Sequence, residues 1–416
     1  MSDKSDVLVI GAGIIGTACA YYLIKAGRHV RIIDQDKDSL GASNGNCGLI
    51  VFGHLLPLCS PGAIKNELKR MIRRTSPLYV KPSLSLQRLR WFLNFAGKCN
   101  TRHLAHAIPA RRSILHHSEL LFETLFSEEK IECEREKRGV LMVFKNKAEM
   151  QKYKQTNDYL KPYGQDATPY RGDALLKLEP ALREDVYGAW YHPNESHLRP
   201  DTFLREWLKV LVRQGADFHE DCRFNNFVTE GDRVTKAVTT KGEYIADHFV
   251  LATGAWSPQL TRQLNVDLPV QPGKGYSITM ARPSVCPEIP CYLYDKSVVA
   301  TAWQSGYRLG GTMEFSGFNF TVIPDRLQNL KSVAREYLKN PVGEPVIEEW
   351  VGMRPMIYDD LPVIDTLPFH SNLVVATGHG MTGISMAPGT GKLVADMIAG
   401  HAPHLDPSPF SIKRFL

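Results

Sequence analysis

The sequence predicts an α/β fold built from two domains that alternate along the chain. Residues 6–34 contain a strand, a glycine turn, a helix and a second strand in direct succession. The same order of strand, glycine-rich loop and helix returns in residues 372–400. The segments between have other patterns, and 416 residues exceed the length that one hydrophobic core usually organises. We therefore expect a discontinuous α/β domain interrupted by a second, α+β domain.

The first strand and the glycines after it indicate a site for a dinucleotide. Residues 7–10 form the short apolar run of a buried parallel strand, and the letters GAGIIG follow. In this spacing Gly11 allows a tight turn, Gly13 lets the backbone approach a pyrophosphate, and Gly16 lets the next helix pack closely. A helix over residues 17–26 would direct its N-terminus, with its free N–H groups, at the diphosphate.

The second strand is expected at residues 30–33 and ends in Asp34, eighteen residues after Gly16. A carboxylate at this place accepts hydrogen bonds from an adenosine ribose and repels a 2′-phosphate. An ordinary strand–turn–helix needs neither this acid nor the glycine spacing. The complete unit therefore predicts a Rossmann-type dinucleotide-binding domain.

The composition is that of an ordinary globular protein without a membrane span. Hydrophobic residues make up 43% and charged residues 23% of the chain, and no run of about twenty apolar residues occurs. The polar first residues lack the features of a signal peptide. The eight cysteines form no CxxC pair and no zinc-like cluster with histidine, so we expect reduced thiols and no metal. These features predict a cytoplasmic protein.

Basic residues are concentrated in one segment. Residues 65–90 contain eight Lys or Arg and one acid, and Trp91, Phe92 and Phe95 follow at once. Basic residues beside aromatic residues are typical of an element that meets a membrane surface. The alternatives are a solvated helical face and nucleic-acid binding, but no nucleic-acid-binding motif accompanies the segment. We expect no nucleic acid, and residues 65–95 leave open a peripheral contact with the inner face of the cytoplasmic membrane.

Signals of the α/β domain recur far apart along the chain. Residues 203–214 predict an amphipathic helix, and the strands after it end in the apolar run 249–252. Another apolar strand, residues 373–376, precedes a glycine loop and a helix from about Ser385. The substrate of such a protein is expected at the junction of its domains. The predicted division is 1–50, 198–270 and 350–416 for the α/β domain, and 51–197 and 271–349 for the inserted domain.

Five motifs in a fixed order carry a resemblance to a known family. They are GAGIIG with Asp34, GASNGNCG, ATGAWS, GMRPM and TGHGMTGISMAPGTGK. Through them nearly the whole chain resembles the D-amino-acid oxidase superfamily of FAD-dependent amine oxidoreductases, and it is most similar to the bacterial D-amino-acid dehydrogenases. The stretch NCGLIVFGHLLPLCSPGA is similar to the branch that acts on D-proline or D-hydroxyproline.

The resemblance implies FAD as the cofactor. A nicotinamide dehydrogenase needs only one Rossmann unit and gives no reason for the later glycine loops. N–H groups at the start of the C-terminal helix suit the N1–C2=O edge of a flavin, where negative charge develops on reduction. The C-terminal loop has no cysteine, so we expect non-covalent FAD. The residues implied in cofactor binding are Gly11, Gly13, Ile14, Ile15, Gly16, Asp34, Gln35, Ala42, Ser43, Asn46, Cys47, Gly48, Leu49, Val228, Thr253, Gly254, Trp256, Gly378, His379, Gly380, Met381, Thr382 and Gly383.

Arg354, in the motif GMRPM, matches the family's substrate-binding arginine. Its guanidinium fork suits a substrate carboxylate, which it can bind through two parallel hydrogen bonds. The alternative for this residue is a surface salt bridge, for example to Asp359 or Asp360.

Four further residues are weaker candidates for the substrate pocket and the chemistry. Tyr276 offers either a second contact to the substrate carboxylate or core packing. His379 lies inside the C-terminal flavin loop and could touch the ring or the amine, although a single histidine is more often structural. His54 and Trp303 are candidates for lining the substrate pocket, with the same structural alternative.

The reaction implied by the resemblance is oxidative deamination of a D-amino acid by FAD. A hydride moves from the α-carbon to flavin N5, which requires orientation of the substrate more than an acid or a base. Electrons would pass to a quinone or another respiratory acceptor. One alternative is an oxygen-dependent oxidase of glycine or sarcosine, and one from another class is a non-catalytic docking protein that FAD stabilises.

Overall fold

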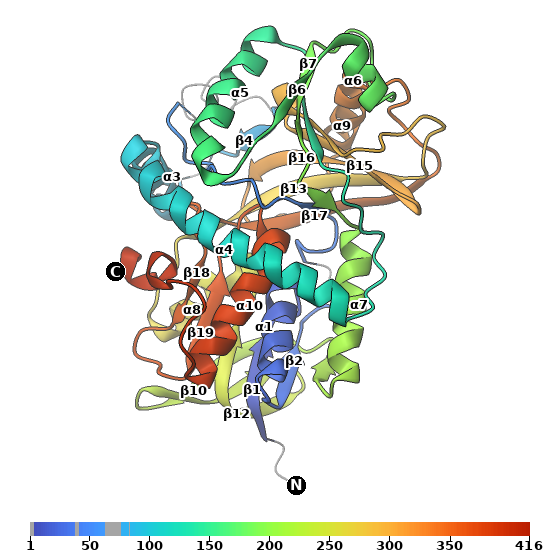
Figure 1. Cartoon of the computed structure of the whole chain (residues 1–416). Helices are drawn as coiled ribbons and strands as arrows, with labels where there is room; N and C mark the ends of the chain where they lie inside the picture. The colour runs from blue at the N-terminus through green and yellow to red at the C-terminus, as the bar shows by residue number, and fades with distance from the viewer. Residues whose placement is uncertain (1–3, 38–40, 63–75, 83) are drawn as a thin grey trace.

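The computed structural model describes residues 4–37, 41–62, 76–82 and 84–416. Within these ranges the strands form an eight-stranded sheet, a nine-stranded sheet and a two-stranded pair. Figure 1 shows the sheet that contains the first strand in the lower half of the molecule and the larger sheet above it. The α/β fold class predicted from the sequence is therefore confirmed.

The eight-stranded sheet has a parallel core. β1 (Lys4–Ile10) lies between β2 (Val30–Ile33) and β12 (Gly242–Leu251). β9 (Asp217–His219) extends the sheet beyond β2, and β19 (Leu373–Thr377) pairs with the end of β12. Because these five strands are parallel, their carboxyl ends meet at one edge, which is where open α/β sheets bind ligands.

The rest of this sheet is antiparallel. The first half of β12 pairs with a hairpin of β10 (Phe224–Glu230) and β11 (Arg233–Thr239), whereas its second half pairs with β19. β18 (Val363–Thr366) pairs with β19 on the outer side. One long strand thus joins the hairpin to the parallel core.

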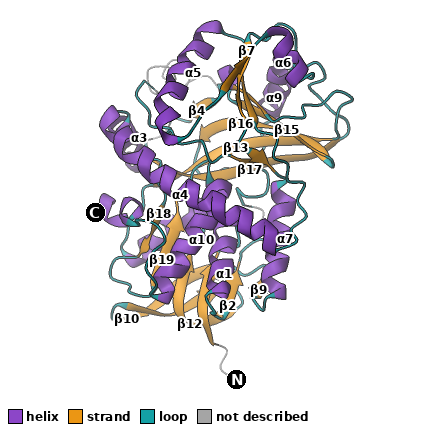
Figure 2. Ribbon diagram, viewed as in Figure 1, coloured by secondary structure: helices purple, strands orange, loops and turns teal. Residues whose placement is uncertain are grey.

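Helices cover one face of the parallel core. α1 (Ile14–Lys25), α7 (Pro200–Arg213) and α10 (Gly383–Ala399) lie side by side, and α4 (Thr101–Glu128) crosses over them (Figure 2). The first and last of these helices are in close contact, since a Cβ placed on Gly391 of α10 would overlap the backbone of α1. Small residues in both helices permit this approach.

The three helices expected from the sequence begin two or three residues earlier than predicted. α1 starts directly after Gly13, which is its N-cap in an extended conformation. α7 starts at Pro200, whose fixed φ suits the first helical position. α10 starts at Gly383 after the cap residue Thr382.

The nine-stranded sheet carries α9 (Pro324–Tyr337) on one face and turns its other face toward the first sheet. Its order along the main path is β17, β13, β16, β15, β14, β5, β7 and β6, with β4 paired to β16. The bounds are β17 Val346–Ile357, β13 Val270–Met280, β16 Gly306–Phe315, β15 Val298–Trp303, β14 Cys291–Leu293, β5 Val140–Phe144, β7 Gly188–His192, β6 Thr168–Tyr170 and β4 Leu78–Val80. β17 crosses the domain boundary predicted at residue 350, and the division into domains stays a prediction.

Shorter elements complete the described part of the chain. They are β3 (Leu49–Ile50), which pairs with β8 (Ser196–His197), and the helices α3 (Leu86–Lys98), α5 (Lys147–Leu160), α6 (Gly172–Leu178) and α8 (Ser257–Thr261). Of the helices in the described ranges, none combines the length and the apolar character needed to cross a membrane.

Candidate active site

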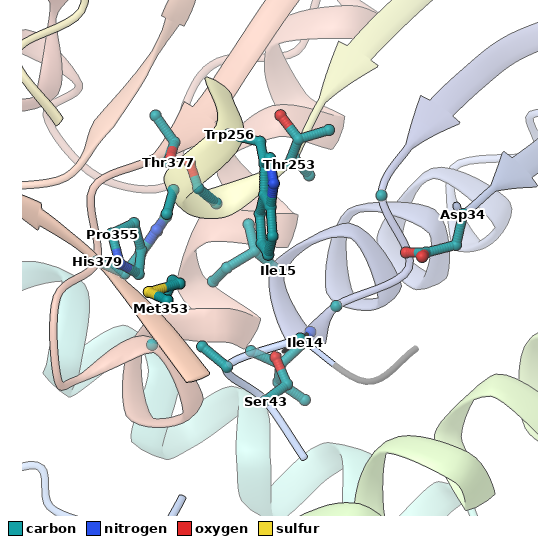
Figure 3. A pocket seen from close by; sticks show the side chains of 18 of the residues that line it. Ile14, Ile15, Asp34, Ser43, Thr253, Trp256, Met353, Pro355, Thr377 and His379 are labelled. Carbon is teal, nitrogen blue, oxygen red and sulfur yellow. Dashed lines mark hydrogen bonds between the residues drawn. The ribbon is translucent and has the colours of Figure 1, made fainter. Parts of the chain in front are cut away.

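A cavity of about 310 Å³ lies where the carboxyl ends of the parallel strands meet β17 of the larger sheet. The ends of β1, β2, β12 and β19 border it, and so do the first turns of α1 and α10. Figure 3 shows Asp34 at one end of the cavity and Met353, Pro355 and His379 at the other. The cavity therefore runs from the first Rossmann unit to the larger sheet.

The glycine turn and Asp34 form the first end of the cavity. The Asp34 carboxylate accepts hydrogen bonds from the backbone N–H groups of Ala12 (2.6 Å) and Asp36 (3.0 Å). Burial raises the pKa of Asp34, and these two N–H groups oppose the rise. Gly11 has φ +102°, and a Cβ there would lie 2.6 Å from the carbonyl oxygen of Ala252. The turn thus needs glycine for two reasons, its conformation and the close strand β12.

Gly16 acts inside the fold rather than on the cavity wall. A Cβ on Gly16 would overlap the carbonyl oxygen of Gly11. The third glycine of the motif therefore lets α1 start directly against the turn. The first helical N–H groups face the cavity nearby, where the Ser43 hydroxyl accepts a hydrogen bond from the N–H of Ile14 (2.9 Å).

The loop after Ser43 is held by its own hydrogen bonds and by a contact from the larger sheet. The Asn46 side chain donates to the carbonyl of Ser43 (2.8 Å) and accepts from the N–H of Gly48 (2.8 Å). Arg308, on β16, donates to the carbonyl of Asn46 (2.8 Å) and pairs with Glu348 (3.0 Å). No local motif marks this buried arginine, so its role in shaping the loop could not be predicted from the sequence.

Cys47 and Gly48 lie behind the cavity wall. A Cβ on Gly310 of β16 would overlap the Cys47 sulfur, so the thiol is packed on the larger sheet. Burial raises the pKa of Cys47, and the nearby Arg308 and Arg354 oppose the rise. Gly48 has φ +68° and packs against the backbone of Leu198.

The C-terminal loop forms the second end of the cavity. Gly378 and Gly380 have φ of +82° and +54°, and the N–H of Gly380 donates to the carbonyl of Pro355 (3.1 Å). His379 Nε2 is hydrogen-bonded to the Thr390 hydroxyl (2.9 Å), while Nδ1 has no partner among the described residues. Burial lowers the pKa of His379 to about 3, so the ring is neutral. The loop thus offers a neutral imidazole and the start of α10 to the cavity.

Arg354 reaches the cavity from β17 and lies flat over the neighbouring strand. A Cβ on Gly275 would overlap its guanidinium, and Nη1 donates to the carbonyl of Thr312 (2.9 Å). Burial lowers the pKa of Arg354, and Cys47 and Tyr292 oppose this. Within the described ranges no carboxylate lies within salt-bridge distance of it.

The structural alternative for Arg354 is excluded by the partners of the two acids. Asp359 pairs with Arg414 (2.8 Å) and Asp360 pairs with Arg111 (3.1 Å). The fully buried arginines Arg308 and Arg326 also have acidic partners.

Tyr276 lies on the other face of the larger sheet. In the register of β13 and β17, Arg354 is opposite Gly273, whereas Tyr276 is opposite Val351, an odd number of residues away. Side chains alternate between the faces of a strand, so the tyrosine points toward α9. It is 1% exposed, and its hydroxyl donates to Glu314 (3.0 Å). This position corresponds to the core-packing alternative and corrects the expected substrate contact.

His54, Trp303 and Val228 are also away from the cavity wall. The carbonyl of His54 accepts a hydrogen bond from Arg111, and burial lowers the pKa of its ring to about 4. Trp303 is 1% exposed and packs against Gly48. Val228 pairs with Lys236 inside the β10–β11 hairpin, and Cys222 to Phe224 line the cavity instead.

The cavity wall gathers most of the residues expected from the sequence. Those on it are Gly11, Gly13, Ile14, Ile15, Asp34, Gln35, Ala42, Ser43, Asn46, Leu49, Thr253, Gly254, Trp256, Arg354, His379, Gly380, Met381 and Gly383. Those not on it are Gly16, Cys47, Gly48, Val228, Gly378, Thr382, Tyr276, His54 and Trp303. Sequence reasoning missed Trp350 and Met353, although Trp350 could have been found from its even spacing to Arg354 along one strand.

Comparison with known proteins assigns the family. Residues 6–397 match the model of the DAO family, FAD dependent oxidoreductase, and the chain belongs to this family. The protein is thus an FAD-dependent oxidoreductase, as the resemblance implied.

Individual relatives cover almost the whole chain. It is 28% identical over 415 residues to D-amino acid dehydrogenase of Granulibacter bethesdensis, covering 98% of this chain and 99% of the relative. It is 29% identical to D-amino acid dehydrogenase of Vibrio atlanticus, covering 99% of this chain and 100% of the relative. Glycine oxidase from Geobacillus kaustophilus has the same fold, with a TM-score of 0.80, 21% identity and 99% of each chain covered.

Proposed function

We propose that the protein dehydrogenates D-amino acids, with a hydride moving from the α-carbon to flavin N5 of bound FAD. Electrons then pass to a quinone or another respiratory carrier. The observation that carries the proposal is Arg354, a cation on the cavity wall without an acidic partner among the described residues. Both relatives named above are D-amino acid dehydrogenases and match along nearly their whole length.

The residues on the cavity wall fit FAD along its length. Asp34 would bind the adenosine ribose, and the first N–H groups of α1 with Ser43 would face the pyrophosphate. Asn46, Leu49, Gly380 and the start of α10 would surround the flavin. The positive end of α10 would favour negative charge on the flavin edge that it faces.

Arg354 would bind and orient the substrate. A buried guanidinium needs a negative partner, and a bidentate carboxylate supplies it with two charge-assisted hydrogen bonds. The bond from Nη1 to the Thr312 carbonyl fixes the plane of the fork over β13. A carboxylate held there has one orientation relative to the flavin loop, so the α-carbon hydrogen can be aimed at one position.

The same arginine would prepare the amine. A cationic neighbour and a desolvated site both disfavour an ammonium group, so they lower the pKa of the substrate amine. The amine that results has a lone pair to support departure of the hydride. The neutral His379, whose Nδ1 has no partner among the described residues, is close enough to the cavity to contact the amine or the ring. The imine product would hydrolyse in water to a 2-oxo acid, or remain as the product if it is cyclic.

The resemblance of residues 46–63 to the branch acting on D-proline or D-hydroxyproline refines the proposal to these cyclic substrates. For the location we propose the cytoplasm, at the inner face of the membrane, where a respiratory acceptor can be reached.

The proposal is tested by the visible spectrum of the purified protein under anaerobic conditions. D-Proline, cis-4-hydroxy-D-proline, D-alanine, sarcosine and L-proline are added in turn. Bleaching of the flavin band by D-amino acids and not by L-proline is the expected result. A flavin band that no amine bleaches would overturn it in favour of a non-catalytic docking protein. Fastest bleaching by sarcosine, with rapid peroxide formation in air, would favour a glycine- or sarcosine-type oxidase.

A further inference from the structure

Helix α3 has apolar residues on two opposite faces. The inner face packs into the protein: Trp91 is 4% exposed, stacks on Phe95 and donates from Nε1 to the carbonyl of Pro269 (2.9 Å). The outer face carries Leu86, Leu89 and Leu93, which are 80%, 57% and 64% exposed. A helix on the surface of a globular protein normally has one apolar face and one polar face.

The outer face of α3, defined here as Leu86, Leu89 and Leu93, continues into Leu84. The side chain of Leu84 is fully exposed two residues before the start of the helix. The spacing of three and four residues places the helical leucines in one stripe along the axis. Figure 1 shows α3 at the edge of the molecule, where other elements do not overlie it. Isolated exposed leucines are common, but a stripe of them is typical of a surface that a membrane or a protein partner covers.

The sequence around α3 carries the net charge of the protein. Residues 68–118 contain eleven Lys or Arg and no Asp or Glu. The rest of the chain has 39 Lys or Arg against 44 Asp or Glu, a formal charge of −5, although the whole chain is +6. Lys81, Arg90 and Arg102 of this run are exposed beside α3. These three exposed cations give the described surroundings of the leucine stripe a positive charge, which attracts a negative surface.

The inner face of α3 connects this surface to the cavity. Trp91 shares an apolar cluster with Phe315 and Met356. Met356 lies two residues after Arg354, on the same face of β17, and its side chain lies near Gly380 of the flavin loop. A cluster of apolar side chains thus lies between α3 and the loop that contains Gly380.

We infer that the outer face of α3 docks on an anionic lipid bilayer. The leucines would enter the boundary between headgroups and acyl chains, and the exposed basic residues would contact the phosphates. The inference rests on the proposed function, because a quinone acceptor is dissolved in that bilayer. It also changes the basis for membrane contact expected from the sequence, since Trp91 is inside the protein and leucines face outward. Residues 65–75 of the basic segment lie outside the described residues.

The test measures sedimentation of the FAD-loaded protein with lipid vesicles. One set of vesicles contains equal parts of phosphatidylcholine and phosphatidylglycerol, and the other contains phosphatidylcholine alone. The variant carries Leu89→Glu and Leu93→Glu. Leu120→Glu is the matched control, because Leu120 is 56% exposed on α4, away from α3. The flavin spectrum and thermal unfolding of each variant check that it is folded.

The natural protein and the Leu120→Glu control are expected to sediment with the anionic vesicles. The affinity of the double variant for these vesicles should fall by at least about tenfold, because two side chains that contact the acyl chains become anionic. Natural protein that stays in the supernatant would overturn the inference, and so would unchanged binding of the double variant. A dimer in solution that the double variant dissociates would instead assign the face to a second copy. Bleaching by D-amino acids is measured without vesicles, so failure of the proposed function is seen separately.

Discussion

The half-buried Arg354 contacts a different kind of partner from the buried arginines. Arg111 and Arg326 lie against Asp360 and Glu314, whereas Arg354 donates to a backbone carbonyl. A carbonyl satisfies an N–H group but does not neutralise the cation. The compensating negative charge is therefore expected from the cavity side.

Arg354→Met should lower kcat/KM for the best D-amino acid by about 10²- to 10³-fold, the usual effect of removing one partner of a buried charge pair. The loss arises because the substrate carboxylate no longer has a guanidinium to bind it. Arg354→Lys should recover only part of it, since an ammonium lacks two parallel donors. Stopped-flow reduction of the flavin measures both variants.

The exposed Arg233→Met on β11 is the control for removal of an arginine. It should leave kcat/KM unchanged. An Arg354→Met variant as active as the natural protein would show that another residue binds the carboxylate.

Residues with a local motif could be predicted from the sequence, and those with a tertiary role could not. Asp34 and Gly11 were expected at the cavity because strand, turn and acid occur within one continuous segment. Arg308 acts on Asn46 from a strand more than 250 residues away, so no local pattern could find it. For Tyr276, the sequence could not tell which face of its strand meets the cavity.

At the scale of elements, the pairing of β13 and β17 determines the shape of the substrate end. Gly273 and Gly275 of β13 lie under the side chains of Met356 and Arg354, and Gly275 leaves the space in which the guanidinium lies. A side chain at this position would displace the guanidinium. The strand thus shapes the site through the absence of a side chain at Gly275.

Gly275→Ala should lower kcat/KM by about 10²-fold, because a shift of about 1 Å in an orienting group has effects of this size. Most of this loss should come from a higher KM, since the arginine that binds the carboxylate is displaced. Gly97→Ala in α3 is the matched control, because a Cβ there meets nothing within 4 Å. Steady-state kinetics with an unchanged KM for Gly275→Ala would contradict the position given to Arg354.

The elements of the first sheet were more predictable than those of the second. The strands β1 and β19 and the last part of β12 are short apolar runs followed by glycine loops, and each run was expected near its observed place. The nine-stranded sheet has pairings such as β5 with β14 that join distant segments. Turn signals and periodicity do not specify such pairings, so the order of this sheet could not be derived from the sequence.

At the scale of the whole molecule, several buried histidines make stability depend on pH. Burial lowers the pKa of His54 and His192 to about 4 and that of His379 to about 3. An unfolded histidine titrates near 6.5, so below that pH the unfolded chain binds more protons than the folded one. Burial raises the pKa of Glu195 to about 7. Below that pH the folded chain binds one more proton at this residue than the unfolded chain, so Glu195 favours the folded state in acid. The histidines outnumber it, so stability should fall with acid.

His54→Gln should reduce the fall in the free energy of unfolding between pH 6.5 and 4 by about 1.4 kcal/mol per pH unit, the effect of one proton. Urea unfolding at pH 7, 6 and 5 measures this slope. The exposed His106→Gln is the matched control and should keep the slope of the natural protein. An equal slope for both variants would show that His54 titrates in the folded protein as it does in the unfolded chain.

The contact between α1 and α10 has a consequence for synthesis on the ribosome. The first Rossmann unit emerges early, but the helix that covers α1 ends at Ala399. The apolar side of the nascent unit therefore stays uncovered until residues 383–399 have left the ribosome. Chaperones have long access to this surface, and loading of the flavin has to wait for the synthesis of α10. Messages truncated shortly before the α10 codons should yield chains that proteases remove rather than a smaller flavoprotein.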